Sequence, residues 1–203
     1  MCSRGTPEPS PGCRRLEVWY GTFIAVADGP CLQSAPMSRD VIESLARALH
    51  AAYEGDPFHS LRGNLQAVTP REWAAKPENY SEEILGRSLS IGDLVRHAAG
   101  SLWVWGNWAF GDAQRTWTDN VPPGSDMDSL LGWLDDAHRE FVAGLTALAD
   151  DSDLAVERPA PALDTATREQ MVSVMISHMV YHSGELNRQR SLMLGAEGWS
   201  LAD

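Results

Sequence analysis

Cysteine is almost absent from this 203-residue sequence, and Cys2, Cys13 and Cys31 all lie near its N-terminus. An odd number of cysteines in a terminal stretch forms no disulfide framework and fits unpaired thiols in a reducing compartment. The rest of the chain therefore has neither a cysteine nucleophile nor a thiolate ligand for zinc. Any chemistry must use His, Glu, Asp, Ser, Tyr or a bound cofactor, and we expect a cytoplasmic protein.

Long apolar runs and lysines are also scarce. No apolar stretch reaches the roughly 18 residues that a membrane helix needs. The formal net charge is −12, and Lys76 is the single lysine among 16 basic residues. Nucleic-acid affinity depends on clustered Lys and Arg. We therefore expect no membrane and no nucleic-acid partner, and look to small molecules or other proteins.

Several catalytic motifs are missing. The sequence has no GxxxxGK[ST] and no GxGxxG, so nucleotide cofactors have no support. Met179 occupies the position at which an HExxH zinc protease carries glutamate, which removes the main argument for a metalloprotease. Ser101 has no acidic partner in a triad pattern, so a serine hydrolase is not indicated either.

Residues 1–36 mix Pro, Gly, Ser and Cys with one apolar run, Val18–Ala27. The run imitates a secretory signal, but Glu17 and Gly21 weaken that interpretation. We expect an N-terminal extension outside the fold, which is either a disordered tail or the product of a mis-annotated start, with Met37 as the natural first residue.

Helical periodicity begins at Ser38 and predicts four long helices. Ser38 or Asp40 is the expected N-cap of the first, which presents Val41, Leu45, Leu49 and Ala52 on one face and ends near Gly55. The helical segments expected after it are 59–68, a turn at 70–73, 90–111, a helix from Ser125 to Leu148, and 171–194 opened by a capping box at Thr167. Alternating strand patterns are absent, and the segment before Thr167 reads as a loop rich in Asp, Pro and Ala. The fold class is therefore all-α, with residues 37–203 forming a four-helix bundle.

Met171–Leu194 carries the main chemical signal, because His178 and His182 are one helical turn apart. Their Cβ atoms would be about 5–6 Å apart, so both rings can face one ion. His97 lies on the inward arc of the helix at 90–111 and would complete a three-histidine site with open coordination positions. The competing interpretation is that each is a core or boundary histidine bonded to a neighbour. His50, His59 and His138 lie at helix ends or on more polar faces and are not candidates.

Glu185 and a tryptophan cluster surround this predicted site. Glu185 follows His182 by three residues and can orient a ligand, act as general acid or base, or cap the end of the bundle. Trp105 and Trp108 share the His97 face and either wall a pocket for an apolar substrate or cofactor, or belong to the core.

Two segments resemble the DinB/YfiT-like superfamily of metal-binding four-helix bundles: SLSIGDLVRHAAG and MISHMVYHSGELNRQRSLM. ALHAAYEGDPFHSLRGNL and NWAFGD add further similarity, and the resemblance covers about Met37 to Gly195. It implies that His97, His178 and His182 bind a divalent ion such as Zn²⁺ or Ni²⁺, and that a homodimer forms. Some members of the family are thiol-dependent enzymes, including mycothiol-dependent maleylpyruvate isomerases and bacillithiol S-transferases. The family name implies no DNA binding.

Three functions follow as hypotheses. The first is a metal-dependent enzyme that activates a low-molecular-weight thiol, such as mycothiol, for S-transfer or isomerisation of a small-molecule substrate. The second is a non-catalytic metal-binding or stress-response bundle. The third is a metal-assisted hydrolase, for which Glu185 is the one general base that the sequence offers.

Overall fold

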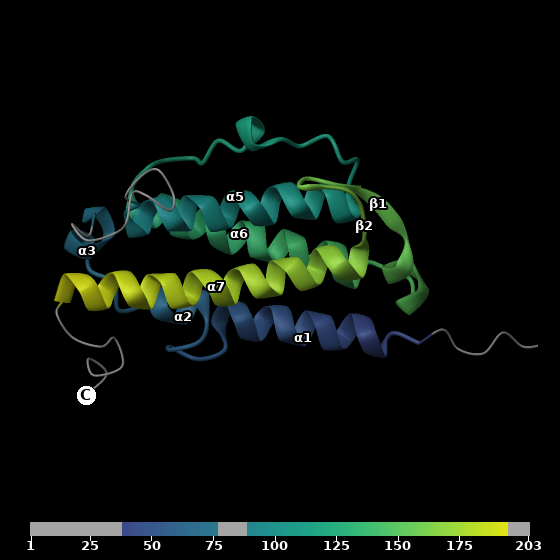
Figure 1. The fold of residues 1–203 in the computed structure, drawn as a ribbon, viewed down its shortest axis with the longest axis horizontal. Coiled ribbons are helices and arrows are strands. Elements are labelled where there is room, and N and C mark those ends of the chain that lie inside the picture. Colours follow the sequence, from purple (N-terminus) through teal and green to yellow (C-terminus); the bar gives the residue numbers. More distant parts are fainter. Residues whose placement is uncertain (1–37, 77–88, 195–203) are drawn as a thin grey trace, which may run out of the picture. The chain divides into compact units, whose positions relative to one another are not determined.

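Four long helical segments form a bundle in the computed structural model, which describes residues 38–76 and 89–194. These helices are α1 (Asp40–Glu54), α5 (Ile91–Phe110), α6 (Met127–Thr146) and α7 (Arg168–Leu194), shown in Figure 1. The shorter elements are α2 (Leu61–Leu65), α3 (Pro70–Ala74), the 3-10 turns η1 (Trp117–Asp119) and η2 (Asp151–Ala155), and the strands β1 (Glu157–Ala160) and β2 (Leu163–Thr167). The prediction of an all-α four-helix bundle is confirmed. The expectations for residues 1–36 lie outside the described residues.

The N-terminal caps of α5 and α7 come from neighbouring residues in the sequence, as predicted. Ser90 and Asp93 form the predicted capping box of α5. Thr167 exchanges hydrogen bonds with Gln170 at the start of α7, as expected. The predicted N-cap of α1 is wrong in position, because Arg39 occupies it without a side-chain bond, although the hydroxyl of Ser38 accepts from the backbone N–H of Asp40 at 3.3 Å.

The cap of α1 comes instead from a distant residue. The carboxylate of Asp151 accepts hydrogen bonds from the backbone N–H groups of Val41 at 3.2 Å and Ile42 at 3.0 Å. A negative group at a helix N-terminus satisfies free N–H groups and interacts well with the helix dipole. Local sequence cannot reveal such a cap, since it arises only when η2 packs against the start of α1.

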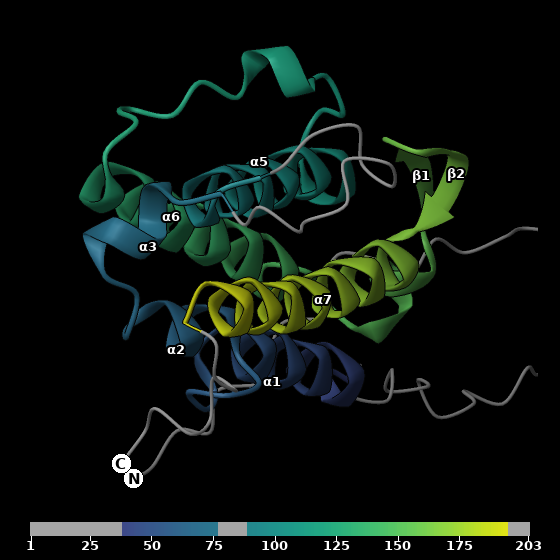
Figure 2. The ribbon, with the colours of Figure 1, turned by 60° about the vertical axis from the view of Figure 1, so that its left-hand side comes forward.

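Interactions at one end of the bundle establish the helix directions. Arg39 donates to the carbonyl of Thr146 at 2.8 Å, and Arg168 donates to the carbonyl of Ala109 at 3.0 Å. The starts of α1 and α7 therefore lie beside the ends of α5 and α6. Because α5 and α6 run in the same direction, residues 111–126 must cross back along the bundle, and Figures 1 and 2 show this crossover on the outer side of α5.

The core lies between the four long helices, and its fully buried large side chains include members of each. They are Ile42, Leu49, Ile91, Leu102, Leu130, Leu134, Phe141, Leu145, Met171, Met175 and Met179. On α1 the predicted inward residue Val41 is 42% exposed, whereas its neighbour Ile42 is fully buried. None of the helices in the described ranges is long and apolar enough to cross a membrane.

A small antiparallel hairpin occupies the segment that the sequence predicts as a loop. β1 pairs with β2 along most of their length, and Ala160 and Ala166 are buried against the core. Arg158 donates to the carbonyl groups of Trp108 and Gly111, which anchors β1 to the end of α5. The expectation of no strands was wrong, because contacts with α5 stabilise a pairing that the polar, Pro-containing sequence does not indicate.

Candidate metal centre

Three imidazole rings meet between α5 and α7. His97 comes from the second turn of α5, and His178 and His182 come from consecutive turns of α7. The Nε2 atom of His178 lies 3.2 Å from Nε2 of His97 and 3.0 Å from Nε2 of His182. One ligand atom from each ring lies within 4.8 Å of the other two. The structure thus brings together the three histidines that the sequence singles out.

The separations fit one shared cation. Zinc binds histidine nitrogen at about 2.0–2.1 Å, so neighbouring ligands at ordinary coordination angles are about 2.9–3.4 Å apart. Both short Nε2–Nε2 separations, 3.0 and 3.2 Å, fall in that range. Neutral imidazoles also suit divalent Zn or Ni, whereas Mg²⁺ and Ca²⁺ prefer oxygen ligands. The donor set therefore suits a transition metal better than Mg²⁺ or Ca²⁺.

The protonation states also favour ligation. Burial, together with the nearby rings of His182 and His97, lowers the pKa of His178 to about 3, although Glu185 acts in the opposite direction. His178 is neutral at pH 7 and offers a nitrogen lone pair. At His182 the other ring nitrogen, Nδ1, lies 2.8 Å from Oε2 of Glu185, and both side chains are almost fully buried.

The three rings differ in exposure, so the site has an open side. His182 is buried, His178 is partly buried and His97 is exposed. Trp117 stacks on His97 with the ring planes 8° apart and the centroids 5.8 Å apart. Tyr181 meets His182 edge-on, with a centroid separation of 5.1 Å. Trp117 and Tyr181 are 50% and 61% exposed, so two aromatic side chains face solvent beside the histidines.

The crossover after α5 positions Trp117. The amide of Asn120 donates to the carbonyl of Gly100 at 3.0 Å, which ties the crossover to α5 one turn beyond His97. The sequence does not predict Trp117 as part of the site, because this residue lies outside the periodic helices. Its one distinguishing feature in the sequence is that it is an aromatic residue within the long connection after α5.

The predicted tryptophans lie elsewhere on α5. Trp105 is part of the buried core, and the indole of Trp108 donates to the carbonyl of Arg115 at 2.7 Å. Their assignment to a substrate or cofactor pocket stays a prediction. The hydroxyl of Ser101 donates to the carbonyl of His97 at 2.8 Å, and His59 interacts with Asp56 at an exposed turn.

Comparison of the chain with models of known protein families identifies a family whose model includes these residues. A family model described as the DinB superfamily matches residues 58–186. The chain belongs to the DinB superfamily. The match includes His97, His178, His182 and Glu185, and thus the whole candidate centre. No curated protein and no solved structure matches the chain. Membership of the superfamily and the histidine cluster together fit a metal-binding DinB-like protein.

Proposed function

We propose that this DinB superfamily protein is a metal-dependent enzyme that activates a low-molecular-weight thiol for S-transfer to, or isomerisation of, a small electrophile. The observation that carries the proposal is the convergence of three histidine Nε2 atoms, from two helices, on a site with an exposed side. His97, His178 and His182 would hold the ion, with Zn²⁺ or Ni²⁺ the best match to the ligands.

The choice of a thiol rests on charge and on resemblance. Three neutral imidazoles leave the charge of a bound divalent ion undiminished, and such an ion lowers the pKa of a thiol that reaches it. Thiol-dependent enzymes occur among the proteins that the His97 and His178–Glu185 segments resemble, and mycothiol is one thiol used in that group. The described residues contain no cysteine, which supports a small molecule as the source of the thiol.

The protein's own residues would perform three tasks. Glu185 would fix the orientation of His182 through Nδ1. Trp117 and Tyr181 would contact the apolar part of the electrophile, because both are exposed beside the histidines. On reaching the ion the thiol would lose its proton to water or to Glu185, and in an S-transfer the electrophile would release its leaving group as sulfur forms the new bond.

Elemental analysis of protein purified without a metal-affinity tag tests the site. We expect about one Zn or Ni per chain, and its loss in His182→Ala. His59→Ala is the matched control, since His59 is exposed and lies apart from the histidine cluster. Equal metal content in the wild type and in His182→Ala would exclude the proposed centre.

A panel of thiols and electrophiles then tests the activity. The metal-loaded protein should bind or turn over at least one combination, and His178→Ala should abolish the turnover. Full metal occupancy without thiol binding or turnover would reject the thiol proposal and leave the metal site standing.

A non-catalytic role is the second candidate, because the site joins two helices. His97 belongs to α5, whereas His178 and His182 belong to α7, so a bound ion would crosslink two members of the bundle. A ligand at 100 times its Kd stabilises the folded state by about 2.7 kcal/mol. A large drop in Tm on chelation, in a protein with no affinity for thiols, would favour this role over catalysis.

The hydrolase hypothesis requires Glu185 as a general base. Its carboxylate already contacts Nδ1 of His182, which favours an orienting role. An unchanged hydrolysis rate in Glu185→Gln would exclude Glu185 as the base. For the whole protein we propose a cytoplasmic homodimer acting on a small molecule, with no nucleic-acid or membrane partner. Light scattering tests the dimer.

A further inference from the structure

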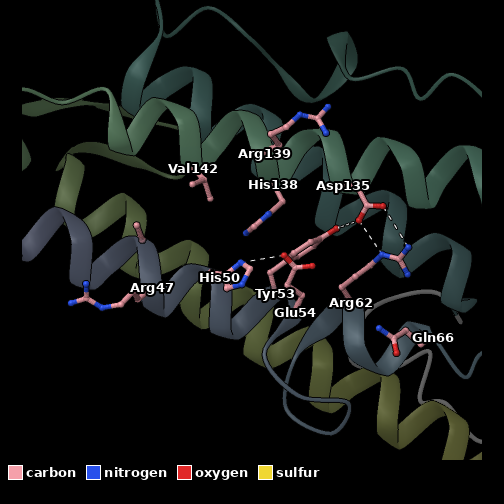
Figure 3. A pocket seen from close by; sticks show the side chains of 11 residues that line it. Arg47, His50, Tyr53, Glu54, Arg62, Gln66, Asp135, His138, Arg139 and Val142 are labelled. Atoms are coloured by element: carbon pink, nitrogen blue, oxygen red, sulfur yellow. Dashed lines mark hydrogen bonds and ion pairs between the residues drawn. The ribbon is translucent and has the colours of Figure 1, made fainter.

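A second cavity, of about 770 Å³, lies between α1 and α6 with α2 beside it (Figure 3). His97, His178 and His182 do not line it, and they belong to α5 and α7. Its volume is within the usual range for pockets that bind small organic molecules. We propose that this cavity is a separate binding site for a small aromatic carboxylate.

His138 provides the first argument for a ligand. It is only 7% exposed, yet its Nε2 atom has no hydrogen-bond partner within residues 38–76 and 89–194. Burial, reinforced by nearby His50, lowers the pKa of His138 to about 4, against the opposing effect of Asp135. The ring is thus a neutral hydrogen-bonding group at pH 7. Buried polar groups are nearly always paired, so this nitrogen has an unmet hydrogen bond. Nε2 has almost no accessible surface, so a ligand that supplies the bond would displace the neighbouring exposed side chain of His50.

Tyr53, which is only 2% exposed, lines the cavity with a firmly held ring. Its ring stacks on His138 with centroids 3.8 Å apart and planes 11° apart. Its hydroxyl donates to Asp135, and Arg62 Nε donates to the same carboxylate oxygen at 2.9 Å. Residues of α1, α2 and α6 therefore fix the ring before any ligand arrives, which reduces the entropy lost on binding.

The lining of the cavity favours a planar ligand. Figure 3 shows the ring of His138 reaching from α6 toward Tyr53 and His50 of α1. Ala46 and Val142 add apolar surface to the lining. An aromatic ring can pack against this apolar surface and against the edges of the stacked rings, whereas a compact inorganic anion would leave the surface uncovered.

The charged residues that line the cavity are Arg47, Arg62 and Arg139 against Glu54 and Asp135, so the lining has one more positive than negative group. Because Arg62 pairs with Asp135, Arg47 and Arg139 are the cations left to meet an anion, with Glu54 the carboxylate that opposes it. In Figure 3 their guanidinium groups extend away from the Tyr53–His138 pair, and they form exposed ion pairs with Glu43 and Asp136 on their own helices. Exposed pairs of this kind contribute little stability. Either arginine can therefore leave its partner to bind a ligand carboxylate through two parallel hydrogen bonds.

Calorimetric titration of the full-length, chelator-treated protein with benzoate tests the proposal. Chelation is needed because a carboxylate can also bind a metal ion at the histidine cluster. We expect benzoate to bind, and benzamide and cyclohexanecarboxylate to bind about 10-fold more weakly, because each lacks either the charge or the aromatic ring. The absence of benzoate binding at millimolar concentration would overturn the proposal.

Matched variants locate the binding. Ala46→Phe fills the cavity and should weaken benzoate binding at least about 10-fold, whereas Ala51→Phe, at an exposed position of the same helix, should not. Arg139→Gln should weaken binding about 5-fold, with exposed Arg188→Gln as its control. His138→Phe preserves an aromatic ring and should also weaken binding.

Two outcomes would place the ligand elsewhere and overturn the proposal. One is equal benzoate affinity in Ala46→Phe and wild type, and the other is loss of benzoate binding in His178→Ala.

Discussion

The Nδ1 atom of His182 lies 2.8 Å from Oε2 of Glu185, one turn further along α7. The other nitrogen of the same ring, Nε2, faces His178 at 3.0 Å. Because a carboxylate accepts hydrogen bonds, Glu185 favours the tautomer with the proton on Nδ1 and leaves the lone pair of Nε2 directed at the site. Glu185 therefore prepares His182 for ligation.

Replacing Glu185 should weaken metal binding. We expect Glu185→Ala to lower Zn²⁺ affinity about 10- to 100-fold, which is typical for removing the partner of a ligating histidine. Glu185→Gln keeps an acceptor and should have a smaller effect. Competition with a chromophoric chelator measures both, with exposed Glu169→Ala on the same helix as control. Unchanged affinity in Glu185→Ala would exclude the orienting role.

Trp117 should strengthen metal binding by holding the ring of His97 in place. The stacked rings restrict the orientation of the most exposed of the three histidines. Aromatic pairs contribute about 0.5–1.5 kcal/mol beyond their buried area, so Trp117→Ala should weaken metal binding roughly 2- to 10-fold. Trp117→Phe should retain most of the affinity, because it keeps an aromatic face. If Phe and Ala weaken binding equally, stacking is not the cause.

The parts of the site that sequence could predict depend on local spacing. His178 and His182 are one turn apart, and the helical period of α5 is read directly from its apolar residues. On α7 the buried apolar stripe is confined mainly to the first half of the helix, and the buried face beyond it is largely polar. The third ligand, His97, also lies on a regular helix. His97 lies next to His178 and His182 because α5 and α7 pack in an antiparallel arrangement. A four-helix bundle allows this arrangement but does not require it.

The features that the sequence does not predict depend on tertiary packing. Asp151 caps α1 from more than 100 residues away, and Trp117 reaches His97 from a connection without periodicity. His138 appeared to lie on a polar face, but it is buried because Tyr53 covers its ring. In each case the partner comes from a different element, so residue type and helical phase carry no signal.

His138 should make stability depend on pH. Its pKa is about 4 in the folded protein against an ordinary value of 6.5, so between these values the unfolded chain binds the additional proton. The contribution of His138 to stability is therefore fully present above pH 6.5 and decreases as the pH falls toward 4. From pH 7.5 to 5 this histidine should remove on the order of 1–2 kcal/mol.

Urea unfolding of chelator-treated wild type and His138→Phe isolates this contribution. All other residues are the same in both proteins, so the difference between the two pH profiles belongs to position 138. The variant should lose less stability on acidification, whereas exposed His59→Phe should follow the wild type. Parallel profiles for wild type and His138→Phe would contradict the assignment.

Arg190 and Glu72 form a buried ion pair that joins α7 to α3. Arg190 Nε lies 2.9 Å from Glu72 Oε1, and each side chain is 8% exposed. Glu72 also accepts from the backbone N–H of Thr69, and Arg190 donates to the carbonyl of Ala67. Burial alone would raise the pKa of Glu72, but the bonds from Thr69 and Arg190 outweigh it and lower the pKa. The carboxylate is therefore charged at neutral pH.

Removing one partner of this pair should cost more than removing both. Arg190→Met leaves the charge of Glu72 buried and unpaired, so unfolding free energy should fall by about 3–5 kcal/mol. Arg190→Met combined with Glu72→Met should recover part of that loss, because no uncompensated charge remains. Urea unfolding at pH 7 measures both, with exposed Arg188→Met as the control. A loss below about 1 kcal/mol in Arg190→Met would mean that water reaches Glu72 when the arginine is gone, because a solvated carboxylate needs no partner.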